Sequence, residues 1–171
     1  MDFFEAFSAI NIRFLIDGLR VTVEVSILSI LFSFIIGGIA GILRFSSIPV
    51  FSKVLGVVID VIRNLPLLLI IFFTYFALPQ IGIRFNIFWS AVVALTIFES
   101  AMLSEIFRAG LNSVPKGQME ASRSLGMTYT RTMQKIILPQ AIKIMIPSFV
   151  NQFVISLKDT TIISVIGVVE L

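Results

Sequence analysis

Residues 19–43 read LRVTVEVSILSILFSFIIGGIAGIL, and this stretch decides the fold class. Its only ionisable residues are Arg20 and Glu24, both within its first two turns. A helix of this length reaches about 37 Å, which is enough to cross a hydrocarbon core of about 30 Å with some tilt. It is too long for the apolar core of a secretory signal, and the residues before it are acidic where such a signal is basic. The stretch therefore predicts a retained transmembrane helix.

The composition also indicates a membrane protein. Hydrophobic residues make up 57% of the 171 residues, charged residues only 13%, and a soluble domain of this length has no interior large enough for that excess. The chain has no Cys and no His, which excludes disulfides, thiolate or imidazole catalysis and the usual zinc sites. It also lacks a P-loop for nucleotide hydrolysis. We expect a single all-α membrane domain over 1–171 that is not an enzyme and binds no cofactor or metal itself.

Further apolar stretches predict a polytopic helical bundle with four complete spans, at about 19–43, 54–78, 87–107 and 139–157. The second stretch contains charges and Pro66, so either residues 54–64 lie in the interface or a kink at Pro66 joins two halves of one tilted helix. Residues 162–169 are apolar but too few to span, and we interpret them as the start of a fifth helix in a C-terminally truncated chain. Gly37 and Gly41 in the first span predict close helix packing.

The distribution of charge predicts the orientation. Six of the 13 basic residues, but only one acidic residue, Glu120, lie between Arg108 and Lys143. By the positive-inside rule this long loop is cytoplasmic, which places the N-terminus outside. Phenylalanines at near-helical spacing in residues 1–18 indicate a short amphipathic helix on the membrane surface, with an unstructured terminus as the alternative.

The cytoplasmic loop, residues 112–138, predicts a helical hairpin rather than a solvated linker. Pro115 suits a helix start, and Gly126 suits the position of positive φ that ends a helix. Thr128 is placed to cap a second, amphipathic helix, which Pro139 is expected to close. Such a hairpin fits either a groove on another protein or the surface of an anionic membrane, and the residues alone leave both open.

Several short motifs resemble the membrane permease subunits of bacterial ABC importers. Glu120-Ala121-Ser122, Gly126 and Ile137-Leu138-Pro139 resemble the EAA loop of that family. Residues 104–110, 117–121, 125–126, 138–141 and 158–161 resemble its polar amino acid branch, which includes histidine, glutamine and arginine permeases. Residues 63–68, Arg-Asn-Leu-Pro-Leu-Leu, resemble the Arg-Gly-Thr-Pro-Leu-Leu of that branch with two substitutions. The matches cover most of the chain from about residue 60 onward.

The resemblance implies a permease subunit that carries polar amino acids across the bacterial cytoplasmic membrane. It implies ABC ATPase subunits that bind ATP and Mg, a second identical or homologous permease subunit, and an extracellular or periplasmic amino acid binding protein. Membrane lipid is the remaining partner, and no nucleic acid is expected. In the family the EAA loop is the coupling helix that fits a cleft on the ATPase. The matching positions here are Glu120, Ala121, Gly126, Leu138 and Pro139.

Polar groups inside the spans suggest where a substrate passes. Gln152, Ser156 and Asp159 fall on one face of a helix, at i, i+4 and i+7, with Asn151 beside them. They offer the amide and carboxylate groups that an amino acid zwitterion needs, and Glu99 adds a second anionic group that favours a cationic substrate. The alternative is that these side chains only brace neighbouring helices.

A second function is consistent with the residues. The chain can be a membrane scaffold whose basic cytoplasmic hairpin recruits another protein, without transport. Copurification with a P-loop ATPase would distinguish the importer from the scaffold.

Overall fold

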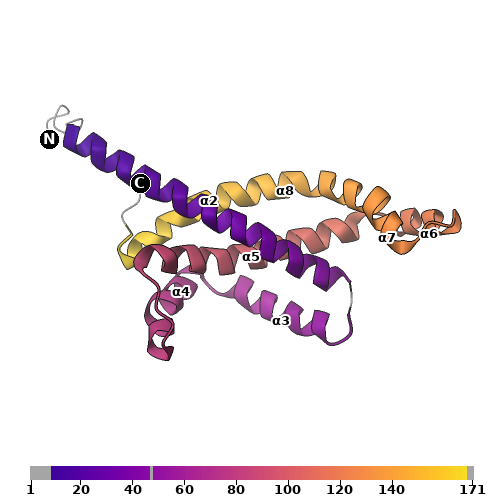
Figure 1. Ribbon diagram of the computed structural model, residues 1–171, viewed down its shortest axis with the longest axis horizontal. Helices are drawn as coiled ribbons and strands as arrows, with labels where there is room; N and C mark the ends of the chain where they lie inside the picture. Colours follow the sequence, from indigo (N-terminus) through magenta and orange to yellow (C-terminus); the bar gives the residue numbers. More distant parts are fainter. Residues whose placement is uncertain (1–8, 47, 169–171) are drawn as a thin grey trace.

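The computed structural model describes residues 9–46 and 48–168, apart from the side chains of residues 9 and 10. This part of the chain is mostly helical and contains no strand. Three helical segments in it are long and apolar enough to cross a membrane, Asn11–Phe45, Ile87–Ser113 and Tyr129–Ile166, and a sharply bent helix pair makes a fourth if it is counted as one span. Figure 1 shows α2, α5 and α8 running lengthwise together, with α3 alongside and a small hairpin, α6 and α7, at one end.

Helix α2 (Ala9–Phe45) contains the predicted first span and begins earlier than expected. Residues 9–18 continue the same helix and form no separate surface helix, while residues 1–8 lie outside the described part of the chain. Along its inner side, α2 approaches α5 (Ile87–Ser113) very closely. A Cβ on Gly37 would lie 2.7 Å from the Ser100 carbonyl oxygen, and one on Gly41 would lie 2.7 Å from the Ser104 carbonyl oxygen. The predicted close packing at these glycines is confirmed.

The predicted second span is broken near its middle. Helix α3 (Phe51–Asn64) meets the helical segment Leu67–Ile81, which begins with helix α4 (Leu67–Phe72), at a bend of 102°. Pro66 disfavours a helical conformation in the residue before it, and Leu65 is extended, with φ −80° and ψ 139°. The bend is therefore encoded locally, and residues 54–78 do not form one straight helix.

Beyond α4 the chain makes a π-helical turn, η1 (Phe73–Ala77), and a 3-10 turn, η2 (Leu78–Ile81), before it reaches α5. In Figure 1 this segment projects from the end of the bundle opposite α6 and α7. Helix α5 begins at a cap in which the Asn86 side chain accepts a hydrogen bond from the Trp89 amide at 2.8 Å. It continues past the predicted end at residue 107 to Ser113.

The second helix of the cytoplasmic hairpin does not end at Pro139. Helix α7 (Tyr129–Thr132), π turn η3 (Met133–Ile137), α8 (Leu138–Asp159) and 3-10 helix η4 (Thr160–Ile166) form one continuous helical segment. The wider π turn just before Pro139 accommodates a residue that has no N–H and whose ring clashes with a regular preceding turn. A π turn likewise precedes Pro79. The prediction that Pro139 closes the helix is wrong.

Helix α5 organises two hydrophobic cores. Its first half packs with α4 and η4 around buried residues that include Ile71, Leu95 and Ile163. Its second half packs with α8 around Leu103 and Met145. The apolar residues after Lys158, expected to start a fifth helix, instead lie in η4, which ends at Gly167 with φ +90° and places Ile163 in the first core.

Candidate functional site

A buried carboxylate lies in the middle of α5. Glu99 is fully buried, and its Oε2 accepts a hydrogen bond from Gln152 Nε2 of α8 at 2.9 Å. Its other oxygen, Oε1, has no hydrogen-bond partner among the described residues. A buried carboxylate oxygen without a donor is costly. The site is therefore one that a cationic or hydrogen-bond-donating ligand would stabilise.

Two further polar residues of α8 approach this carboxylate. The Ser156 hydroxyl group lies near the Glu99 carboxyl group as a hydrogen-bond donor for it, and Asp159 places a second negative charge nearby. Ser156 is fully buried and its hydroxyl group makes no hydrogen bond of regular geometry in the described part of the chain, while Asp159 is half-buried. The predicted helical face of Gln152, Ser156 and Asp159 thus turns toward Glu99. Asn151, in contrast, is exposed on α8.

The cytoplasmic hairpin has the turn that its sequence predicted. Helix α6 (Lys116–Ser124) follows Pro115 and ends in a Schellman motif. In this motif the Gly126 amide donates to the Arg123 carbonyl at 3.0 Å and the Met127 amide donates to the Ser122 carbonyl at 3.1 Å. Gly126 has φ +81°, a conformation that an L side chain disfavours.

The next helix begins at the predicted cap. The Thr128 side chain accepts a hydrogen bond from the Arg131 amide at 3.4 Å, and α7 starts at the following residue. This cap and the preceding turn bring the two short helices together in a hairpin whose tip is residues 125–128.

The tip of the hairpin is exposed and partly apolar. Leu125 is 84% exposed, and no atom lies within 4 Å of the place where a Cβ on Gly126 would be. Glu120 and Ala121 are also exposed on α6, and Glu120 forms no ion pair within the described ranges. Leu138 and Pro139 are exposed at the base of the hairpin, where α8 begins.

Sequence reasoning missed an ion-pair cluster where α2, α3 and α5 meet. Glu105 Oε2 accepts a hydrogen bond from Arg44 Nη1 at 2.8 Å and lies 3.7 Å from Arg63 Nη1. Arg108 binds both carboxylate oxygens of Glu105. Asp60 Oδ1 lies 3.7 Å from a terminal nitrogen of Arg44 and of Arg63. The sequence signal was that two of the resembling motifs, residues 63–68 and 104–110, contain three of these charged residues, Arg63, Glu105 and Arg108.

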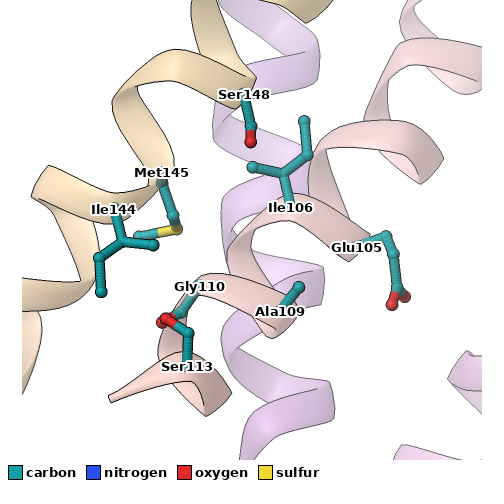
Figure 2. Close-up of a pocket in the computed structure, with 8 residues that line it drawn as sticks. All are labelled: Glu105, Ile106, Ala109, Gly110, Ser113, Ile144, Met145 and Ser148. Atoms are coloured by element: carbon teal, nitrogen blue, oxygen red, sulfur yellow. The ribbon is translucent and has the colours of Figure 1, made fainter.

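A cavity of about 300 Å³ lies between α5 and α8, beside this cluster. Figure 2 shows its lining, where Gly110 and Ser113 of α5 face Ile144 and Met145 of α8 while the Glu105 carboxylate points away from α8. The lining is mostly apolar, and its polar groups do not converge on a common point. In the described ranges no group of three or more acidic residues could hold a metal ion.

The chain is similar in sequence to a known family of proteins. Residues 26–170 match the model of the family described as binding-protein-dependent transport system inner membrane component. The chain is 54% identical, over all of its length and 78% of the relative, to the probable glutamine ABC transporter permease protein GlnP of Bacillus subtilis (strain 168). It is 37% identical, over 92% of its length and 72% of the relative, to the arginine transport system permease protein ArtQ of the same organism.

Solved structures show the same arrangement of helices. A crystal structure of an amino acid ABC transporter with histidines superposes with a TM-score of 0.92 at 37% identity, covering 100% of this chain and 79% of that one. An inward-facing structure of the MetNI methionine ABC transporter superposes with a TM-score of 0.82 at 20% identity, covering 96% of this chain and 79% of that one, and supports the fold alone.

Proposed function

The chain belongs to the family of binding-protein-dependent transport system inner membrane components, and on that premise we propose how its geometry serves transport. It is an ABC importer permease subunit, a multi-pass protein of the inner membrane. It is a transport component and not an enzyme, because ATP hydrolysis belongs to a separate subunit of such importers. This membership favours transport over the scaffold function.

The substrate class that we infer is polar amino acids. The observation that carries it is the fully buried Glu99, whose Oε1 has no hydrogen-bond partner among the described residues although Gln152 donates to Oε2. An ammonium or guanidinium group supplies the donors and the positive charge that such an oxygen lacks. Ser156 and Asp159 widen the polar surface along α8. The relatives named for glutamine and arginine transport support a polar cargo.

The orientation follows from the charge distribution. We place the N-terminus outside and the hairpin of α6 and α7 in the cytoplasm, because that hairpin and its flanks carry six of the 13 basic residues. With α3 and α4 counted as one bent span, the chain crosses the membrane four times.

The exposed hairpin is the proposed contact with an ABC ATPase. Its tip offers Leu125 for an apolar cleft, and Gly126 leaves room for the backbone of a partner to approach closely. Glu120 and Ala121 lie beside the tip and contribute to the same surface, whereas Leu138 and Pro139 support it from the base. A second permease subunit and an external binding protein complete the assembly, and ATP and Mg bind to the ATPase.

Uptake by the purified complex tests this function. The chain is coexpressed with its ATPase, copurified, and reconstituted with its binding protein in vesicles that contain ATP and Mg. We expect ATP-dependent uptake of one labelled amino acid, with competition from a limited set of polar amino acids. Uptake that needs no ATP would refute the importer. Failure to copurify with any ATPase, from a membrane in which the chain is correctly inserted, would favour the scaffold.

A further inference from the structure

Two sequence motifs with no part in the proposed pathway or hairpin meet in the fold. Residues 63–68 supply Arg63, and residues 104–110 supply Glu105 and Arg108. Although they are far apart in the chain, their charged groups form one cluster with Arg44 of α2 and Asp60 of α3.

Glu105 is the centre of this cluster. Among the described residues, Glu105 contacts the three arginines Arg44, Arg63 and Arg108. Asp60 lies within 3.7 Å of Arg44 and Arg63 only. The Arg44 side chain is 10% exposed and that of Glu105 is 21% exposed, so water screens their interaction weakly. Removing the charge of Glu105 would leave three neighbouring guanidinium groups with a single, more exposed carboxylate.

The cluster connects the ends of α2 and α3 to the second half of α5. Arg44 lies in the last turn of α2, and Arg63 lies in the last turn of α3, just before the 102° bend. Glu105 lies about two turns before α5 ends at Ser113, and α6 begins three residues after that end. A single rigid helix therefore joins the hairpin to the ion-pair cluster.

The far side of the bend is also attached to α5. Leu67, Ile70 and Ile71 of α4 are buried in the core formed with the first half of α5. The Thr74 hydroxyl approaches the Ser90 carbonyl at 3.4 Å. At the other end of α3, the Ser52 hydroxyl donates to the Arg44 carbonyl at 2.9 Å. Just before the bend, α3 is held by the packing of Ile62 against this core and, on its charged side, by the ion pairs of Glu105 and Asp60.

We propose that Glu105 is a positioning residue for transport, which ties the end of α3 and the bend at Leu65 and Pro66 to the cytoplasmic half of α5. A displacement of α6 then reaches the bend through α5 instead of being absorbed by sliding of α3 over its neighbours. An unpaired arginine inside a membrane is unfavourable, so the ion pairs keep the helices in register during such a motion. The proposal rests on the proposed function, because it requires that an ATPase moves α6.

The test compares Glu105→Gln with Glu105→Asp in the reconstituted complex with its ATPase and binding protein. Glu24→Gln is the matched control, because Glu24 forms an exposed ion pair with Arg20, with the two side chains 45% and 76% exposed. Uptake and ATP hydrolysis are measured on the same vesicles, and the melting temperature is measured on the same preparations. We expect Glu105→Gln to retain ATP hydrolysis while uptake per ATP falls at least tenfold, and Glu105→Asp to recover part of that ratio.

The outcomes separate coupling from mere stability. If the ratio of uptake to ATP hydrolysis is the same in Glu105→Gln and Glu24→Gln, the proposal is overturned. It is also overturned if uptake by Glu105→Gln falls only in proportion to the amount of folded complex. If Glu105→Gln does not fold, Arg63→Gln decides by the same ratio, because Arg63 lies 3.7 Å from its acidic partners and is 35% exposed. Absence of ATP-driven uptake by the unsubstituted complex would instead refute the proposed function.

Discussion

The contact between α2 and α5 makes a quantitative prediction at Gly41. A Cβ at this position would lie 2.5 Å from Phe107 Cβ and 2.7 Å from the Ser104 carbonyl oxygen, whereas ordinary contacts begin at 3.4 Å. Both obstructing atoms are fixed to the backbone of α5, so a rotamer change cannot relieve the overlap. The substitution Gly41→Ala therefore forces the two helices apart by somewhat less than about 1 Å or distorts one of them.

The magnitude follows from a comparison with Gly56 of α3. A Cβ at Gly56 would meet its nearest atoms, in the Arg44 side chain, at 3.7 Å, which is an ordinary contact. Each substitution by alanine gains about 1 kcal/mol of helix propensity, and this gain cancels in the comparison. Overpacking a close contact costs about 1–3 kcal/mol. We expect Gly41→Ala to be less stable than Gly56→Ala by about 1–3 kcal/mol.

Denaturation of the purified chain in mild detergent measures this difference. The two variants are titrated with sodium dodecyl sulfate and followed by the fluorescence of Trp89, the only tryptophan of the chain. The unfolding midpoint of Gly41→Ala should lie clearly below that of Gly56→Ala. Equal midpoints would show that α2 and α5 do not pack closely enough at Gly41 for a Cβ to overlap the α5 backbone.

Two further predictions concern the hairpin and the polar cluster. Gly126→Leu should abolish stimulation of the ATPase while the chain still inserts into the membrane. Gly82→Leu is the control, because Gly82 has a similar φ of +89° and equally open surroundings. Normal uptake by Gly126→Leu would contradict the docking role. Gln152→Leu removes the donor to Glu99, which costs about 1–3 kcal/mol of stability if nothing replaces it. The Km for uptake should rise in Gln152→Leu and in Asp159→Asn, and an unchanged Km with a lower melting temperature would favour a bracing role.

Local features of the structure were predictable because their causes are local. The positive φ of Gly126 and the cap at Thr128 follow from the chemistry of a few neighbouring residues. Pro66 was recognised as an interruption, since proline restricts its own φ and the residue before it. The same rule wrongly predicted that the helix ends at Pro139, because a π turn lets the helix continue through this residue.

The pairing of distant side chains was not predictable in the same way. Glu99 was predicted to be an anionic group inside a span, and Gln152 to be part of a polar helical face, but only the packing of α5 on α8 joins them across 53 residues. The bond between Arg44 and Glu105 spans 61 residues, and no sequence pattern predicted it. The angle of 102° at Pro66 likewise depends on where α3 and α4 find their partners on α5.

By itself, the sequence determined that this protein lies in a membrane, which segments are helical, and what kind of loop projects from them. Hydropathy and turn chemistry act over a few turns of helix and need no knowledge of the fold. Only the tertiary structure decided which helix faces meet. Leu95 is fully buried and Ile27 is 60% exposed, yet lipid is as apolar as a protein core, so hydrophobicity cannot distinguish the two environments. The faces that meet are instead set by close backbone contact at glycines and by the pairing of the few charged residues, and both depend on three-dimensional packing.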